Sequence, residues 1–227
     1  MLQRYSCNDA ALLDSIGGLT GTLYGGATLQ YGYLSLGSTS QYAVLPTTSL
    51  GSYLSATIEL WLSAAGTGQA AYANILEWDN SPLGRSGGSW LQIYRNNYNN
   101  IYVTFNDGSW RDGASTATMD GESNMHLVLT VTQGDYLRLY KNGALISTST
   151  TVYATFPAGK LTIGKVDTTG VLGSVDEIRI YGRALTPMEI VGNYFSGKGV
   201  CLSFTTVVTT DLLSNQPCRY EHTPSGH

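Results

Sequence analysis

The stretch LTIGKVDTTGVLGSVDEIRIYGRALTPMEI, residues 161–190, is the most informative part of this chain about its fold. Its first two thirds indicate two β-strands, residues 161–166 and 173–181, because polar and apolar side chains alternate along the second of them with a period of two. One face of that strand is expected to carry Val175, Glu177, Arg179 and Tyr181, and the other Asp176, Ile178 and Ile180.

A short helix is expected directly after these strands, over residues 186–194. Thr186 is a suitable N-cap, Pro187 suits the first helical position, and Glu189 stands three residues after the cap. Together they form the start signal known as a capping box. We therefore expect the domain to end with two strands and a short helix.

The composition places the rest of the chain in the all-β class. The sequence has 227 residues, of which only 12% are charged, and it is rich in Gly and Tyr. Turn signals separate short apolar runs, and Asn142-Gly143 between YLRLYK and ALISTS predicts a tight hairpin. A net charge of −4 argues against nucleic acid as a partner, and no apolar run is long enough to span a bilayer.

The closing stretch resembles the end of a LamG-like, concanavalin A-like jelly-roll domain. RYSCNDAALLDSIGGLTGTLYGGATL, GYLSLGSTSQYAVLP, ATIELWLS and HLVLTVTQGDYLRLYKNGALIS resemble earlier strands of that family in the same order. The resemblance implies an antiparallel two-sheet jelly-roll sandwich and a mostly non-catalytic binding module, extracellular or at the cell surface, although no signal peptide is visible. We expect residues 1–199 to form the domain and residues 200–227 a C-terminal extension with a strand-like start.

A hairpin around Asn96-Asn97-Tyr98 supplies the main candidate site. A three-residue loop would pair Arg95 with Asn99 and would place the apolar residues of both strands on one face. The other face then carries rings and amides, from Trp90, Gln92, Tyr94, Asn100 and Tyr102. Aromatic rings stack on sugars and amides pair with hydroxyls, so this face is a candidate carbohydrate-binding surface. Packing of the same face against a protein partner is the alternative.

Carboxylates suggest two further site types, both weaker. Loop oxygens at Asp79, Asn80 and Asp107 could hold calcium, but Gly37 and Gln41 stand where relatives of the family often carry Asp. Glu77-Trp78-Asp79 resembles the start of the Glu-x-Asp-x-x-Glu pattern of related glycosidases, yet Pro82 stands at the position of the acid. Since Asp176 and Glu177 are adjacent, they are expected on opposite faces, and His126 is expected to be structural. We therefore expect no catalytic residues and no required cofactor.

The sequence predicts a non-catalytic module that binds a glycan, with a cell-surface or matrix protein as the other partner class and a role in cell adhesion. The alternative is a structural or protein-interaction subunit of a surface assembly, and a glycosidase is the weakest prediction. Three cysteines allow one bridge. Cys201–Cys218 is preferred, Cys7–Cys201 is the runner-up, and Cys7 is otherwise expected to be a buried free thiol.

Overall fold

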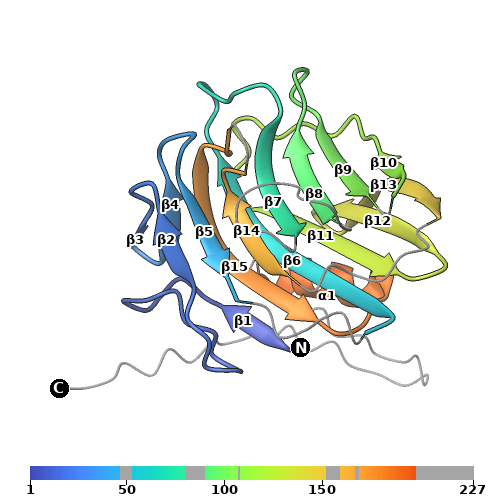
Figure 1. Cartoon of the computed structure of the whole chain (residues 1–227), viewed down its shortest axis with the longest axis horizontal. Helices are drawn as coiled ribbons and strands as arrows, with labels where there is room; N and C mark the ends of the chain where they lie inside the picture. The colour runs from blue at the N-terminus through green and yellow to red at the C-terminus, as the bar shows by residue number, and fades with distance from the viewer. Residues whose placement is uncertain (47–52, 80–89, 107, 152–158, 167–168, 198–227) are drawn as a thin grey trace, which may run out of the picture.

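Two antiparallel β-sheets face each other in the computed structural model (Figure 1). The structure describes residues 1–46, 53–79, 90–106, 108–151, 159–166 and 169–197. The first sheet has eight strands in the order β13-β12-β11-β6-β15-β4-β3, with β1 pairing to β15, and the second has seven in the order β10-β9-β8-β7-β14-β5-β2. All pairings between these strands are antiparallel. The predicted sandwich is therefore confirmed.

The strand bounds follow the short apolar runs of the sequence. The eight-stranded sheet contains β1 (Gln3–Tyr5), β3 (Thr28–Gln30), β4 (Tyr33–Leu36), β6 (Ser55–Ala64), β11 (Met125–Thr132), β12 (Tyr136–Lys141), β13 (Ala144–Thr151) and β15 (Gly173–Tyr181). The seven-stranded sheet contains β2 (Thr22–Tyr24), β5 (Tyr42–Leu45), β7 (Ala73–Asp79), β8 (Trp90–Arg95), β9 (Ile101–Asn106), β10 (Trp110–Gly113) and β14 (Lys160–Gly164). Helix α1 spans Pro187–Gly197.

The hydrophobic core lies between the two sheets. Leu60 and Ile178 enter it from one sheet, and Ile93, Val103 and Ile163 enter it from the other, each at most 1% exposed. Burial of one such aliphatic side chain contributes about 1.5–3 kcal/mol. Because strand side chains alternate, the residues between these core positions project from the outer face of each sheet.

The hairpin turn and the helix start agree with the sequence prediction. Lys141 pairs with Ala144, so Asn142 and Gly143 form a two-residue turn, with φ angles of 52° and 82°. At the helix start, the Glu189 amide donates to Thr186 Oγ1 at 3.3 Å, and the Thr186 amide donates to Glu189 Oε2 at 2.8 Å. Both features arise from local side-chain chemistry, and this is why they were predictable.

A β-bulge in β15 corrects the predicted faces of this strand. The pairing with β6 shifts between Val175 and Ile178, so Asp176 and Glu177 together stand opposite Trp61. Val175, Ile178 and Ile180 consequently all enter the core. The expectation that Val175 shares a face with Glu177 was wrong, and so was the opposite placement of Asp176 and Glu177. An extra residue in one strand resets the alternation. The sequence signal of this shift is the pair of consecutive polar residues between Val175 and Ile178.

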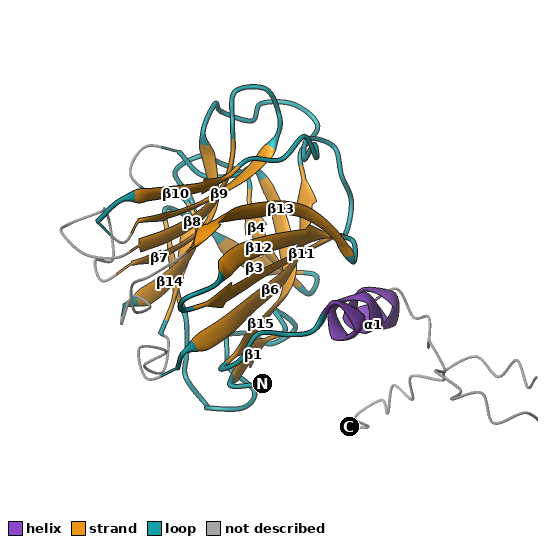
Figure 2. Cartoon of the chain, turned by 90° about the vertical axis from the view of Figure 1, so that its right-hand side faces the viewer, coloured by secondary structure: helices purple, strands orange, loops and turns teal. Residues whose placement is uncertain are grey.

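Helix α1 covers part of the outer face of the eight-stranded sheet (Figure 2). Ile190 of the helix joins a small apolar cluster with Val128, Tyr140, Tyr181 and Leu185. This leaves the outer face of the seven-stranded sheet, on the opposite side of the sandwich, uncovered by the helix.

Candidate functional site

The candidate site lies on the outer face of the seven-stranded sheet, at its β7, β8 and β9 strands. Leu91 and Ile93 of β8 point into the core, so Trp90, Gln92 and Tyr94 project from the other face. In the same way, Val103 and Phe105 of β9 are core residues, and Tyr102 and Thr104 project outward. The structure therefore places the predicted ring and amide residues of these two strands on the face away from the core.

The register of this hairpin differs from the prediction by two residues. Arg95 pairs with Ile101, Tyr94 with Tyr102, and Gln92 with Thr104. The connection is a five-residue loop, residues 96–100, and not three residues. Since a shift of two preserves the alternation, the side chains that lie on β8 and β9 keep their predicted face although their partners change.

Asparagine side chains determine the longer loop. Asn96 Oδ1 accepts hydrogen bonds from the amides of Tyr98 and Asn100, each at 2.9 Å. Asn99 adopts φ 66°, and its Oδ1 accepts from the amides of Met119 and Asp120 at 3.1 and 2.8 Å. Asx hydrogen bonds of this kind compete with continued strand pairing. Asn100 therefore lies in the loop, half-buried, and not on the strand.

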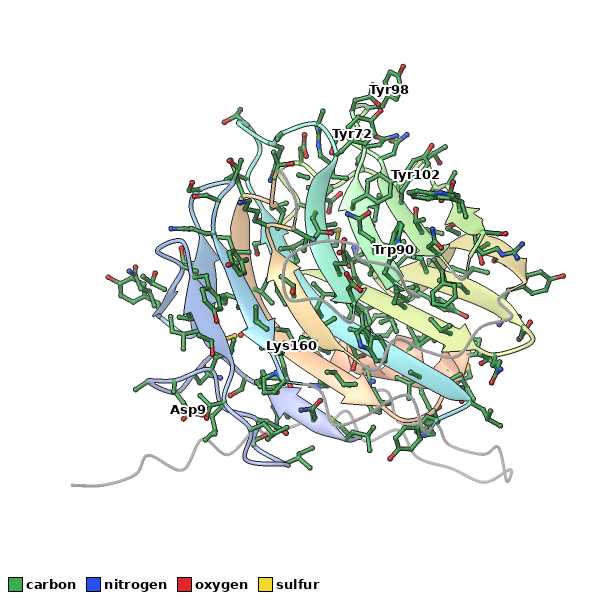
Figure 3. The ribbon with its side chains drawn as sticks, in the orientation of Figure 1. Asp9, Tyr72, Trp90, Tyr98, Tyr102 and Lys160 are labelled. Carbon is green, nitrogen blue, oxygen red and sulfur yellow. The ribbon has the colours of Figure 1, made fainter. Side chains whose placement is uncertain are left out.

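Three tyrosines gather on this face and are here called the tyrosine cluster: Tyr72, Tyr94 and Tyr102. Figure 3 shows Tyr72 and Tyr102 near the upper end of the face. The Tyr94 ring centroid lies 5.7 Å from that of Tyr102 and 6.3 Å from that of Tyr72. Tyr72 is 59% exposed, and the other two are half-buried. Tyr72, just before β7, was not predicted as part of the site, because its place beside Tyr94 depends on the pairing of β7 with β8, which the sequence pattern does not give.

Trp90 and Gln92 lie deeper than the prediction implied. Trp90 is 4% exposed and meets Trp110 of β10 edge-on, with 5.0 Å between ring centroids, whereas Trp110 is 60% exposed. Gln92 is 7% exposed, and its Nε2 donates to Asn74 Oδ1 at 2.9 Å. Both residues therefore support the surface from below, and the accessible rings beside them are those of Trp110 and the tyrosine cluster.

Burial raises the pKa of the Tyr94 phenol. The hydroxyl consequently stays protonated around neutral pH and can act as both donor and acceptor. Beside it, the Thr104 hydroxyl donates to Asp112 Oδ1 at 2.8 Å. The upper part of this face therefore combines flat rings with fixed polar groups.

The carboxylates Glu77 and Asp79 both project from the outer face of β7, lower on the same sheet. Glu77 pairs with Gln92 and Thr162, and Asp79 pairs with Lys160, which lies near the lower end of the face in Figure 3. They are only 2% and 3% exposed, so in this structure a sugar could not approach either group.

Two of the three calcium candidates, Asn80 and Asp107, lie outside the described residues. Asp79, the third, is buried at the end of β7. Within the described part of the chain, no three His, Cys, Asp or Glu side chains form a group that could hold a metal ion. Calcium binding at these residues therefore stays a prediction.

A second polar cluster lies under helix α1, on the outer face of the other sheet. The Glu59 carboxylate, fully buried, lies 2.8 Å from His126 Nε2 and accepts from Tyr181 Oη at 2.9 Å and from Asn193 Nδ2 at 3.0 Å. Arg179 stacks on Trp61, 4.5 Å from the ring centroid, and its Nε donates to Glu177 at 2.7 Å. The cluster joins helix to sheet, and His126 lies within it, fully buried.

Cys7 is a buried free thiol in this structure. The runner-up bridge from Cys7 to Cys201 stays a prediction, because Cys201 lies outside the described residues. Cys201 and Cys218, together with the whole predicted C-terminal extension, lie outside the described residues. In the described part, no helix is long and apolar enough to cross a membrane.

Comparison with known structures agrees with this architecture. Domain 4 of the extracellular arabinanase AbnA from Geobacillus stearothermophilus, solved in complex with arabinotriose, matches 84% of this chain and 96% of its own at 18% identity, with a TM-score of 0.66. The binding domain of botulinum neurotoxin DC, in complex with SialylT, matches 86% of this chain and 51% of its own at 16% identity, with a TM-score of 0.65.

A third similar structure is the sialidase of Trypanosoma rangeli, in complex with a difluorinated KDN derivative. It matches 88% of this chain but only 32% of its own at 16% identity, with a TM-score of 0.68. This chain therefore spans about half of the neurotoxin binding domain and about a third of the sialidase. At these identities the similarity establishes the fold alone. No curated protein sequence matches the chain.

The family itself follows from the sequence comparison. The family model described as the concanavalin A-like lectin/glucanases superfamily matches residues 37–191, more than half of the chain. This range contains the strands that carry the candidate site, β7 to β10, and the closing pair β14 and β15. The chain therefore belongs to the concanavalin A-like lectin/glucanase superfamily.

Proposed function

We propose that this protein is a non-catalytic glycan-binding module that acts through the outer face of the seven-stranded sheet. The observation that carries the proposal is the tyrosine cluster: three rings within 6.3 Å of their neighbours, accessible to solvent and bordered by hydroxyl and amide groups. Trp90, Gln92 and Asn100 belong to the same site as supports, because they hold the strands and the loop that present these rings.

The chemistry of this surface suits a sugar. A tyrosine ring presents a flat apolar face that can cover the C–H face of a sugar ring, and its hydroxyl can pair with a sugar hydroxyl. Covering about 60 Å² of apolar area contributes about 1.5 kcal/mol, which corresponds to about tenfold in affinity. Two such rings would account for a useful part of the binding of a small oligosaccharide.

Buried carboxylates support the absence of catalysis. Glycoside hydrolysis needs an acid and a second carboxylate that flank the scissile bond. Glu77 and Asp79 are closed to solvent, and Glu59 is fully buried under α1. The similar domains solved with arabinotriose and with SialylT support a glycan as the ligand class.

We further propose that the module acts outside the cell or at its surface, with residues 1–199 as the binding domain and residues 200–227 as an extension. The similarity to a domain of an extracellular arabinanase supports this location. A glycan or a glycosylated surface protein is the proposed partner.

A glycan array tests the proposal, with wild-type protein compared with a Tyr94→Ala/Tyr102→Ala variant. Tyr33→Ala is the matched control, because Tyr33 is 43% exposed on the opposite sheet. Binding by wild type and control, lost in the cluster variant, is the expected result. Repeating the array with a chelator tests the calcium prediction: a loss of binding under that condition would move the site to the loops.

If folded wild-type protein binds no glycan, the proposed function is wrong. The exposed rings would then have to be explained by a protein partner, and the alternative of an interaction subunit in a surface assembly would take its place.

A further inference from the structure

The tyrosine cluster is one end of a longer row that crosses the sheet at a single level. Strand pairing aligns Tyr24 with Tyr42 and Tyr42 with Gly164, and it aligns Asn74 with Tyr94 and Tyr94 with Tyr102. The two halves are joined where Asn74 Nδ2 donates to the Gly164 carbonyl at 2.7 Å. The row therefore runs over six neighbouring strands, from β2 through β5, β14, β7 and β8 to β9.

The far end of this row is a second aromatic platform. The Tyr24 and Tyr42 rings stack with 4.8 Å between centroids and 10° between planes. Tyr24 is 43% exposed and Tyr42 is half-buried, so the pair presents ring surface to solvent as the tyrosine cluster does. The face thus carries an aromatic pair at both ends of one row.

The two row residues between the pairs, Gly164 and Asn74, carry no bulky side chain. Gly164 has none, and it cannot gain one easily, because a Cβ there would lie 2.6 Å from the Gln41 carbonyl oxygen and the residue has a φ of +95°. The short Asn74 side chain is held by its bonds to Gly164 and Gln92. Three strand spacings separate Tyr42 from Tyr94, about 14 Å at ~4.8 Å each. This distance is too long for one sugar ring to bridge.

We infer that this site takes an extended, unbranched, neutral polysaccharide that lies across the strands and contacts Tyr24 and Tyr42 at one end and Tyr94 and Tyr102 at the other. A terminal sugar would need only one pair of rings, whereas a chain uses both. None of the six row residues carries a formal charge, so a neutral chain suits the row better than an acidic one. The inference rests on the proposed glycan-binding function and extends it.

Affinity as a function of chain length tests this inference. The probes are linear oligosaccharide ladders with arabinan, xylan, mannan and β-glucan backbones, titrated calorimetrically into wild-type protein. Two double variants are compared with it, Tyr24→Ala/Tyr42→Ala and Tyr94→Ala/Tyr102→Ala. The control is Tyr33→Ala/Tyr136→Ala on the opposite sheet, whose side chains are 43% and 44% exposed. Circular dichroism and thermal melting show whether each variant folds.

For a backbone that binds, affinity should rise about tenfold once the chain is long enough to reach both pairs. This gain should disappear in the Tyr24/Tyr42 variant and persist in the control. Short and long chains that bind equally well, or a gain that survives in a folded Tyr24/Tyr42 variant, would overturn the inference and leave glycan binding intact. Failure of every ladder to bind folded wild-type protein would remove the neutral-chain inference outright, and array binding to other sugars would then decide the proposed function separately.

Discussion

Replacement of Glu59 by Gln should destabilise the domain strongly, because this carboxylate joins α1 to the eight-stranded sheet. It is fully buried and contacts His126, Tyr181 and Asn193 at 2.8–3.0 Å. A hydrogen bond to a charged group contributes about 1.5–3 kcal/mol, against about 0.5–1.5 kcal/mol for a neutral one. Three weakened bonds, at about 1 kcal/mol each, give a loss of about 3 kcal/mol.

For a domain of this size, a loss of that magnitude lowers Tm by about 6–12 °C. Urea titration and thermal melting would measure it. Glu122→Gln is the matched control, because Glu122 meets Lys141 at 2.8 Å with 36% of its side chain exposed, and exposed pairs contribute about 1 kcal/mol at most. If Glu59→Gln costs no more than Glu122→Gln, the buried cluster does not hold the helix to the sheet.

Three further outcomes follow from single residues. Hydrogen bonds from Arg183 and from the capping-box groups of Thr186 lower the pKa of Glu189 from 4.5 to about 2. The stabilisation from these bonds is therefore complete above pH 4.5 and is lost as the pH falls towards 2. Chemical denaturation across this range should show a flatter pH dependence of stability for Glu189→Gln than for wild type, and equal slopes would contradict this. Gly164→Ala should cost about 3 kcal/mol or more through its clash with Gln41, and Gly18→Ala, with φ +70° but nothing within 4 Å, only about 1 kcal/mol; similar urea midpoints for the two would refute the close approach. Burial raises the pKa of Cys7 to about 12, so peptide mapping after iodoacetamide treatment should find it alkylated only in unfolded protein, and alkylation of the native thiol would show that it is accessible.

Features set by local chemistry were the predictable part of this fold. Asn142-Gly143 tolerates the positive φ angles of a tight turn, and Thr186 with Glu189 caps the helix start. The β15 bulge was missed although Asp176 and Glu177 are two consecutive polar residues, which interrupt the polar and apolar alternation between Val175 and Ile178. Their displacement depends on pairing with β6, which is a tertiary property.

The candidate site was predicted in part, for a similar reason. Alternation placed Tyr94 and Tyr102 on the outer face, since alternation survives a shift of two residues. Alternation gives the face of a side chain but not how deeply it is buried. Trp90 was therefore expected at the surface, although its ring is buried beside Trp110. Tyr24 and Tyr42 reach the same row only through pairings between strands that are distant in sequence. The disulfide Cys201–Cys218 remains a prediction.

Hydroxyl-radical footprinting of the wild-type protein, with and without a saturating glycan chosen from the array, tests whether the glycan binds at the tyrosine cluster. It reports where the ligand lies without altering the protein. We predict reduced oxidation of Tyr72, Tyr94 and Tyr102 in the complex, with Tyr33 and Tyr136 on the opposite sheet unchanged. Protection of Tyr33 or Tyr136 while the tyrosine cluster stays reactive would show that the glycan binds elsewhere, and it would contradict the proposed site.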